Sequence, residues 1–145
     1  MQLYIELEHR RCNNKFDYSI TVDPSFNTSN VLIPAMIIQP YVENAIWHGL
    51  VQKEGHGQLT ISITKGIKQL TCIIEDDGIG RKKAAAIKEQ KQDVHKSMGL
   101  DITAERLNLL SKESGVISSV QIIDVDDGIY AGTKVILQLP LNMMY

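Results

Sequence analysis

Asn44 and His48 are two side chains of this sequence that could do chemistry together. They stand four positions apart within residues 34–50, so on a helix both project from the same face. An asparagine carbonyl is a hard oxygen ligand that suits Mg²⁺, and a nearby histidine can donate to a phosphate oxygen. The pair therefore predicts a magnesium and phosphate site. The alternative is an asparagine that satisfies a neighbouring backbone group and a histidine on the surface.

A second group is the run Asp76-Asp77-Gly78-Ile79-Gly80, which follows an apolar stretch. A carboxylate at a strand end can accept a hydrogen bond from the exocyclic amine of adenine. Such a bond favours adenine over guanine, because guanine presents a carbonyl at that position. Gly78 and Gly80 permit positive φ and a close approach of the backbone to a base or sugar. The alternative is an ordinary Asp-Gly turn that ends a hairpin.

The next segment, residues 81–97, is polar and weakly patterned, which is uncommon in a small domain unless the segment has a function. Gly99 offers a hinge where a helix begins, and helix starts favour anions through their free N–H groups. These features predict a lid that closes over a triphosphate. A solvated, charged loop is the alternative. The lysines that supply positive charge here are Lys82, Lys83, Lys88, Lys91 and Lys96.

The elements that position these groups follow from the spacing of apolar residues. Alternation predicts strands over residues 15–22, 58–64, 70–76, 116–125 and 133–139. Helical spacing predicts a helix tail over 1–12, a short helical turn at Pro34, a main helix from about Pro40 to Leu50 and a helix over 100–110. Strands in hairpins with two or three helices predict an α+β fold. We expect a two-layer α/β sandwich, with a mixed, mostly antiparallel sheet and helices on one face.

Composition narrows the class of protein. A length of 145 residues suits one domain, and a net charge of −2 gives no reason to expect a nucleic-acid partner. Cys12 and Cys72 have no metal-ligand spacing, which favours a reduced, cytoplasmic setting. No apolar run approaches the roughly 18 residues of a membrane helix. We therefore expect any membrane anchor of the parent protein to lie outside this chain.

In their order and context these motifs resemble the N, G1 and G2 boxes of the histidine kinase ATP-binding domain. That family belongs with the gyrase, heat-shock chaperone and mismatch-repair ATPases. The runs YIELEHRR and IQPYVENAIWHGL resemble LytS-type sensor histidine kinases in particular, and Gly132-Thr133 resembles the last glycine box. The resemblance covers about residues 3–141. It implies a Bergerat-type ATP-binding fold over residues 15–145, preceded over residues 1–14 by the tail of a dimerisation helix.

The resemblance also implies roles for individual residues in binding ATP and Mg²⁺. Asn44 would hold Mg²⁺, with His48 as a phosphate contact, and Asp76 would contact the adenine amine. Two glycines, Gly78 and Gly80, would shape the base pocket. Thr133 would support Asp76 from the neighbouring strand.

Gly99 and Leu100 would, by the same resemblance, end the lid beside the phosphates. Glu43 is a candidate to orient or deprotonate the attacking imidazole, although it lies on a different helix face from Asn44. The chain departs from the family pattern at Trp47, where a lysine is common, and at Ser97, where the first glycine of the G2 box is usual.

The function implied is the catalytic domain of a two-component sensor histidine kinase. No Asn-Pro-His-Phe type sequence surrounds His9, His56 or His95, so the γ-phosphoryl group would pass to a histidine on a separate helical domain. A cognate response regulator is the other implied partner. The implied parent is a homodimer anchored in the inner membrane, with this domain in the cytoplasm.

Two alternatives remain open from the residues. A hydrolytic ATPase of the same fold would place a general-base glutamate four residues before the asparagine, where this chain has Pro40. A nucleotide-binding regulatory module without phosphotransfer is the other alternative, which Trp47 and Ser97 favour.

Overall fold

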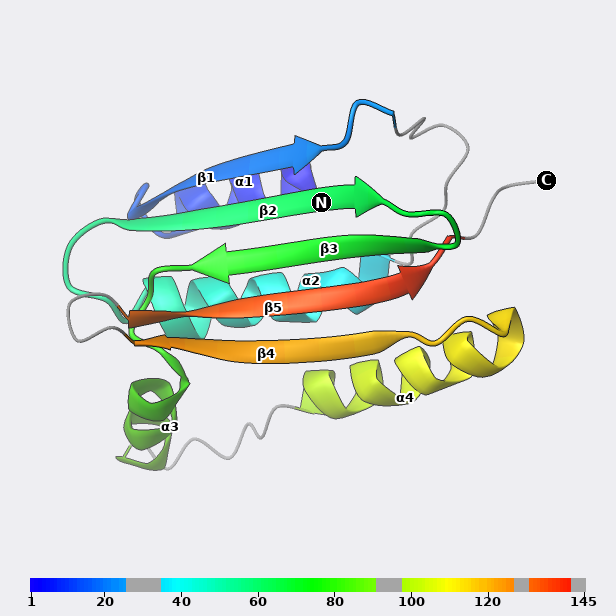
Figure 1. Cartoon of the computed structure of the whole chain (residues 1–145). Helices are drawn as coiled ribbons and strands as arrows, with labels where there is room; N and C mark the ends of the chain where they lie inside the picture. The colour runs from blue at the N-terminus through cyan, green and yellow to red at the C-terminus, as the bar shows by residue number, and fades with distance from the viewer. Residues whose placement is uncertain (26–34, 91–97, 127–130, 142–145) are drawn as a thin grey trace.

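Five strands form one sheet in the order β1-β2-β3-β5-β4 (Figure 1). β1 (Phe16–Val22) runs parallel to β2 (Gly57–Lys65). The remaining neighbours pair antiparallel, namely β2 with β3 (Gln69–Asp76), β3 with β5 (Ala131–Pro140) and β5 with β4 (Ser119–Asp126). The computed structural model describes residues 1–25, 35–90, 98–126 and 131–141. The predicted mixed, mostly antiparallel sheet is confirmed, with strand ends shifted by a few residues.

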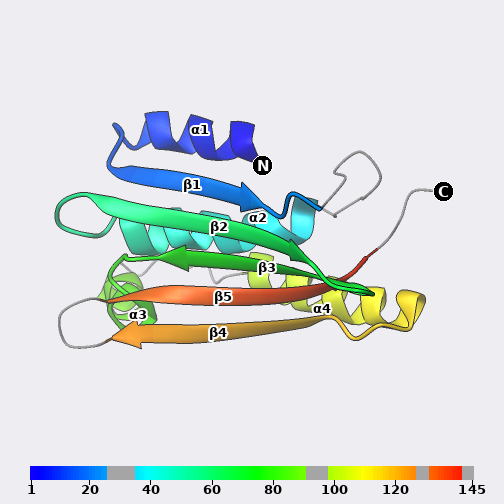
Figure 2. The ribbon, with the colours of Figure 1, turned by 45° about the horizontal axis from the view of Figure 1, so that its top comes forward.

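Helices cover one face of this sheet, as Figures 1 and 2 show. α1 (Gln2–Arg11) lies beside β1, and α2 (Ala35–Asn44) crosses behind the middle strands. α4 (Met98–Ser114) lies behind the β4 side, and α3 (Arg81–Gln90) stands at the end of the sheet where β3 ends. In the described part of the chain, no helix is both long and apolar enough to cross a bilayer.

The core fills the space between this helical layer and the sheet. Alternate residues of the strands point into it, as expected for a sheet with one covered face. The strand contribution is Phe16, Leu59, Ile61, Leu70, Cys72, Ile74, Val135, Leu137 and Leu139, all buried. The helical contribution comes mainly from α2 and the segment after it, at Ile37, Ile38, Tyr41, Val42, Ala45, Ile46 and Leu50.

The expectation that the main helix begins at Pro40 is wrong. α2 begins at Ala35 and passes through Pro40 without ending. As the sixth residue of α2, Pro40 removes one backbone hydrogen bond and crowds the carbonyl four residues earlier. The apolar residues keep helical spacing on both sides of it, and burial of that continuous face offsets the lost bond.

After Asn44 the helix widens into a π-helical segment, η2 (Ala45–Leu50). The N–H of Val51 donates to the carbonyl of Ile46, five residues earlier, at 2.8 Å. Segments of this kind are rare, and those that are found frequently lie at functional sites.

The start of the predicted lid is a helix, α3, whose second and third residues, Lys82 and Lys83, are exposed. α4 begins at Met98, two residues before the predicted start, so Gly99 lies in its first turn. Lys91, Lys96 and Ser97 lie outside the described residues.

Candidate functional site

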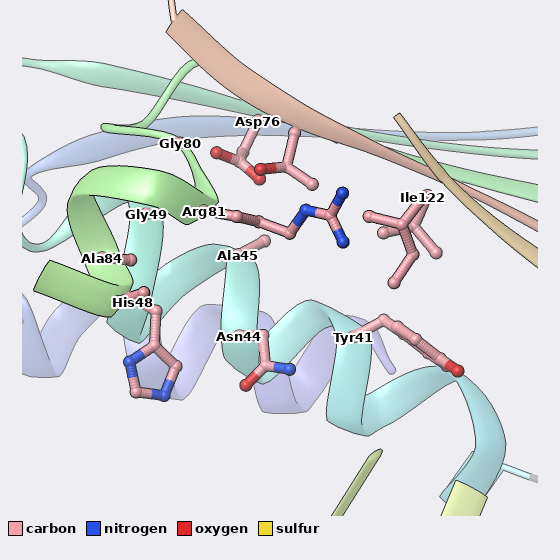
Figure 3. A pocket seen from close by; sticks show the side chains of 13 residues that line it. Tyr41, Asn44, Ala45, His48, Gly49, Asp76, Gly80, Arg81, Ala84 and Ile122 are labelled. Carbon is pink, nitrogen blue, oxygen red and sulfur yellow. The ribbon is translucent and has the colours of Figure 1, made fainter. Parts of the chain in front are cut away.

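A cavity of about 180 Å³ opens between the sheet and the α2–η2 segment, with α3 at its side (Figure 3). Its walls are mostly apolar, and its ionisable lining residues are Tyr41, His48, Asp76 and Arg81. The other lining residues are Tyr41, Asn44, Ala45, Gly49, Gly80, Ala84, Ala85, Ile122, Thr133 and Val135.

Asp76 is the last residue of β3 and supplies a buried carboxyl to this cavity. Its Oδ1 accepts the N–H of Gly78 at 2.9 Å. Burial is the largest influence and, with the charges of Asp77 and Glu75, raises the pKa of Asp76 to about 7. The Gly78 N–H and the Lys53 charge act in the opposite direction. A ligand with a hydrogen-bond donor at its edge could therefore form a strong hydrogen bond with the desolvated Asp76 carboxyl group.

The glycines after Asp76 bring two backbone segments together. A Cβ at Gly78 would overlap the backbone of Gly49, and the N–H of Ile79 donates to the Gly49 carbonyl at 3.3 Å. Gly80 has φ +82°, a conformation that side-chain-bearing residues rarely adopt. Of the two predicted glycines, Gly78 is required for close approach to the Gly49 backbone and Gly80 for positive φ, while their contact with a base or sugar stays a prediction.

Asn44 and His48 reach the cavity from the helical side. Asn44 ends α2 and is half-buried, while His48 lies in η2 and is exposed. Figure 3 shows both side chains on the helix opposite Asp76. Asn44 and Asp76 therefore line the same cavity from different layers.

Glu43 is exposed and is absent from the residues described as lining the cavity. It lies toward α1, where its charge adds to the burial that raises the pKa of Tyr4 to about 12. The structure thus separates Glu43 from Asn44, as the sequence suggested.

Thr133 sits directly beside Asp76 in the register of β3 and β5. The same Thr133 pairs with Asp124 of β4 on its other side. Residues paired across a sheet point to the same face. Asp76, Thr133 and Asp124 consequently form a row across three strands on the cavity side.

The backbones of Gly99 and Leu100 lie in the first turn of α4, and the surroundings of these two residues fall outside what is described. Sequence reasoning missed the apolar wall and two other residues, Gly49 and Arg81. A glycine inside a helical pattern costs stability, which was a signal for Gly49. Arg81 carried no local signal beyond its place after Gly80.

The metal-ligating side chains of the cavity suit a nucleotide that binds together with its own cation. Among the described residues, no group of three or more His, Cys, Asp or Glu side chains could hold a metal alone. A cation held by the single Asn44 oxygen needs phosphate and water ligands, which is the usual arrangement for Mg²⁺. The apolar walls beside one buried carboxyl match a flat heterocycle with an amine at its edge.

Solved structures with a similar architecture include histidine kinase catalytic domains. A mycobacterial sensor histidine kinase, MprB, aligns with a TM-score of 0.63 at 16% identity over 99% of this chain and 93% of that one. The histidine kinase ThkA, solved in complex with the response regulator protein TrrA, aligns with a TM-score of 0.60 at 15% identity, covering 97% of this chain and 38% of that one. The fold is therefore that of a histidine kinase catalytic domain.

Sequence comparison identifies the branch of that class. The sensor protein LytS of Oceanobacillus iheyensis is 32% identical over 121 residues, which cover 79% of this chain and 20% of LytS. YwpD of Bacillus subtilis is 30% identical over 117 residues, which cover 80% of this chain and 41% of YwpD. No protein-family model matches the chain. The chain is a homologue of LytS sensor histidine kinases, and it spans about a fifth of that LytS relative.

Proposed function

We propose that this chain binds ATP with Mg²⁺ and acts as the catalytic domain of a two-component sensor histidine kinase. It would transfer the γ-phosphoryl group to a histidine on a separate helical domain. The observation that carries the proposal is the shared cavity, which Asp76 lines from the sheet and Asn44 lines from the helix.

Asp76 would select the base. Its carboxylate would accept the adenine amine, and the Gly78 N–H keeps the carboxylate oriented. Thr133, next to Asp76 across β3 and β5, would support the same edge of the base. Tyr41, Ala45 and Val135 would exclude water from the ring, which strengthens the hydrogen bond at its edge.

Asn44 and His48 would hold the phosphate end. The Asn44 oxygen would ligate Mg²⁺, which when bound neutralises phosphate charge, and His48 would donate to a phosphate oxygen. Lysines of the segment that begins at Arg81, together with the Gly99–Leu100 turn, would cover the phosphates. In this arrangement the chain contributes mostly by positioning and charge neutralisation.

Glu43 would act outside the cavity. Its exposed carboxylate is available to a side chain from another domain, so it would orient or deprotonate the incoming imidazole. α1 would then be the end of the helical connection to that domain, because Leu3 and Leu7 are exposed one turn apart on it.

The whole protein would be a homodimeric sensor anchored in the inner membrane, with this domain in the cytoplasm. A response regulator would accept the phosphoryl group from the histidine, by analogy with ThkA, which was solved with its regulator TrrA.

A nucleotide-binding module without phosphotransfer is the second candidate function. It is favoured by Trp47, which is 39% exposed on η2 where the family often carries a lysine. Hydrolysis is disfavoured because Pro40, four residues before Asn44, has no basic group to activate water.

Calorimetric titration of the chain with ATP, with and without Mg²⁺, tests the proposal. We expect Mg²⁺-dependent binding of ATP and much weaker binding of GTP. Adding a separately purified helical domain from a LytS homologue should then give acid-labile phosphohistidine on that domain. Binding without transfer would favour the regulatory module, and absence of binding would overturn the nucleotide site.

A further inference from the structure

We propose that the guanidinium of Arg81, whose orientation is fixed by Asp124, forms a stacking face for the nucleotide base. The inference rests on the proposed function and deepens it by naming a residue that positions the base. Arg81 begins α3 and lines the cavity that contains Asp76 and Asn44. In Figure 3 its side chain extends from α3 into the space between the sheet and α2.

Asp124 of β4 fixes the plane of this guanidinium. Arg81 Nε donates to Asp124 Oδ1 at 2.7 Å, and Arg81 Nη2 donates to Asp124 Oδ2 at 2.9 Å. Two parallel hydrogen bonds of this kind define an orientation as well as a contact. The pair is about half exposed, so its main consequence is geometry rather than stability.

The position of Asp124 keeps Arg81 from neutralising Asp76. Both carboxylates belong to the row across β3, β5 and β4, with Thr133 between them. Strands are about 4.8 Å apart, so the two backbone positions are separated by roughly 10 Å. Among the described residues, the carboxylate that pairs with Arg81 is Asp124. The Asp76 carboxyl therefore stays available to a ligand.

The chemistry left to Arg81 is that of its flat face. One edge of the guanidinium is occupied by Asp124, and the cavity around it is lined by apolar side chains such as Ala45 and Ile122. Guanidinium planes stack on nucleobases, and a lysine cannot reproduce this contact. A base whose amine edge meets Asp76 could thus be covered on one side by Arg81.

A phosphate contact is the competing role for an arginine at this place. The two roles differ in what they require of the residue and of the ligand. Stacking needs the planar group and acts on adenosine, ADP and ATP alike, whereas a phosphate contact needs positive charge and acts most on ATP. Arg81→Lys keeps the charge and removes the plane, so it separates them.

The test is calorimetric titration of adenosine, ADP and ATP with the parent chain, Arg81→Ala and Arg81→Lys. Loss of one stacking contact should weaken all three ligands about tenfold in both variants, because the contact is made to the base that all three share. Circular dichroism and thermal unfolding establish that each variant is folded. If lysine restores affinity, or if only ATP binding is weakened, the stacking role is wrong.

Asp124→Asn tests the positioning role of the carboxylate. We expect a loss of adenosine affinity similar to that of Arg81→Ala, and no additional loss in the double variant, because Asp124 acts through Arg81. Additive losses would overturn this coupling. Asp76→Asn distinguishes a failure of the nucleotide site from a failure of the stacking role. If it abolishes binding while the Arg81 variants bind normally, only the stacking inference fails. If the parent chain binds none of the three ligands, both proposals fail.

Discussion

A Cβ at Gly49 would lie 2.8 Å from Oδ1 of Asp76, so the absent side chain of one residue makes room for the carboxylate of the other. The two residues come from different layers, since Gly49 belongs to η2 and Asp76 ends β3. The helical segment therefore packs directly against the strand end that carries the buried carboxyl. This contact connects the helical motif to the strand-end motif.

Gly49→Ala should displace the Asp76 carboxylate while leaving the fold intact. Overpacking of this kind costs about 1–3 kcal/mol of unfolding free energy. Adenosine affinity should fall by roughly tenfold or more, since about 1.4 kcal/mol of lost hydrogen bonding is a factor of ten. Thermal unfolding and calorimetric titration measure the two effects.

The control for this variant is the same substitution in an Asp76→Ala background. The overlap is then absent, and alanine is favoured over glycine in helices by about 1 kcal/mol. Gly49→Ala should become neutral or stabilising there. An equal cost in both backgrounds would mean that Gly49 is required for some other contact.

Asp76→Asn should stabilise the ligand-free chain, and more so at high pH. The pKa of Asp76 is raised from 3.8 to about 7, so the folded state holds a proton that the unfolded state releases within this window. The contribution of Asp76 to the free energy of unfolding therefore falls as pH rises from about 4 to 7. At about 1.36 kcal/mol per pKa unit, the upper bound on this loss is roughly 4 kcal/mol.

Urea unfolding of the parent and the Asp76→Asn variant at pH 5 and pH 8 measures this effect. The variant should gain more at pH 8, and its affinity for adenine nucleotides should fall severely at both pH values. A stability difference that is independent of pH would contradict the raised pKa. Unchanged ATP affinity would contradict the assignment of Asp76 to the base.

Asn44→Ala should abolish the Mg²⁺ dependence of ATP binding, because the proposed protein ligand to the cation is removed. Calorimetric titration with Mg²⁺ and with EDTA measures this dependence. Glu43→Gln is a matched control from the preceding, exposed position, and it should leave the Mg²⁺ dependence unchanged while slowing phosphotransfer. If Asn44→Ala retains the dependence, the cation has another ligand.

Local patterns in the sequence were sufficient for the strands and for the identity of most polar residues in the cavity. Alternation defines β3 up to Asp76, and the two glycines that follow it have the conformational roles that their type allows. The helix through Pro40 was not predictable from local rules. Its stability comes from a buried face that forms only with the sheet in place.

The Arg81–Asp124 pair shows why the rest of the site was missed. The two residues are 43 positions apart, and they meet only because β4 pairs with β5 in a register that places Asp124 beside Thr133. Nothing within a few residues of either one indicates that pairing. The apolar wall was missed for the same reason, since Ile122 and Val135 have the pattern of ordinary strand residues until the sheet order is known.

The chain alone should bind ATP without phosphorylating itself, because the described histidines are occupied by other contacts or lie within the nucleotide cavity. His9 packs edge-on against Phe16 and Tyr18, with ring centroids 5.3 and 5.4 Å away. His56 Nε2 lies 3.1 Å from Asp17 Oδ2, and His48 lines the cavity itself. Incubation with γ-labelled ATP and Mg²⁺ should therefore leave no acid-labile label on the chain, although the same preparation binds ATP. Label that is lost in acid and retained in base would show that one of its own histidines accepts the phosphoryl group.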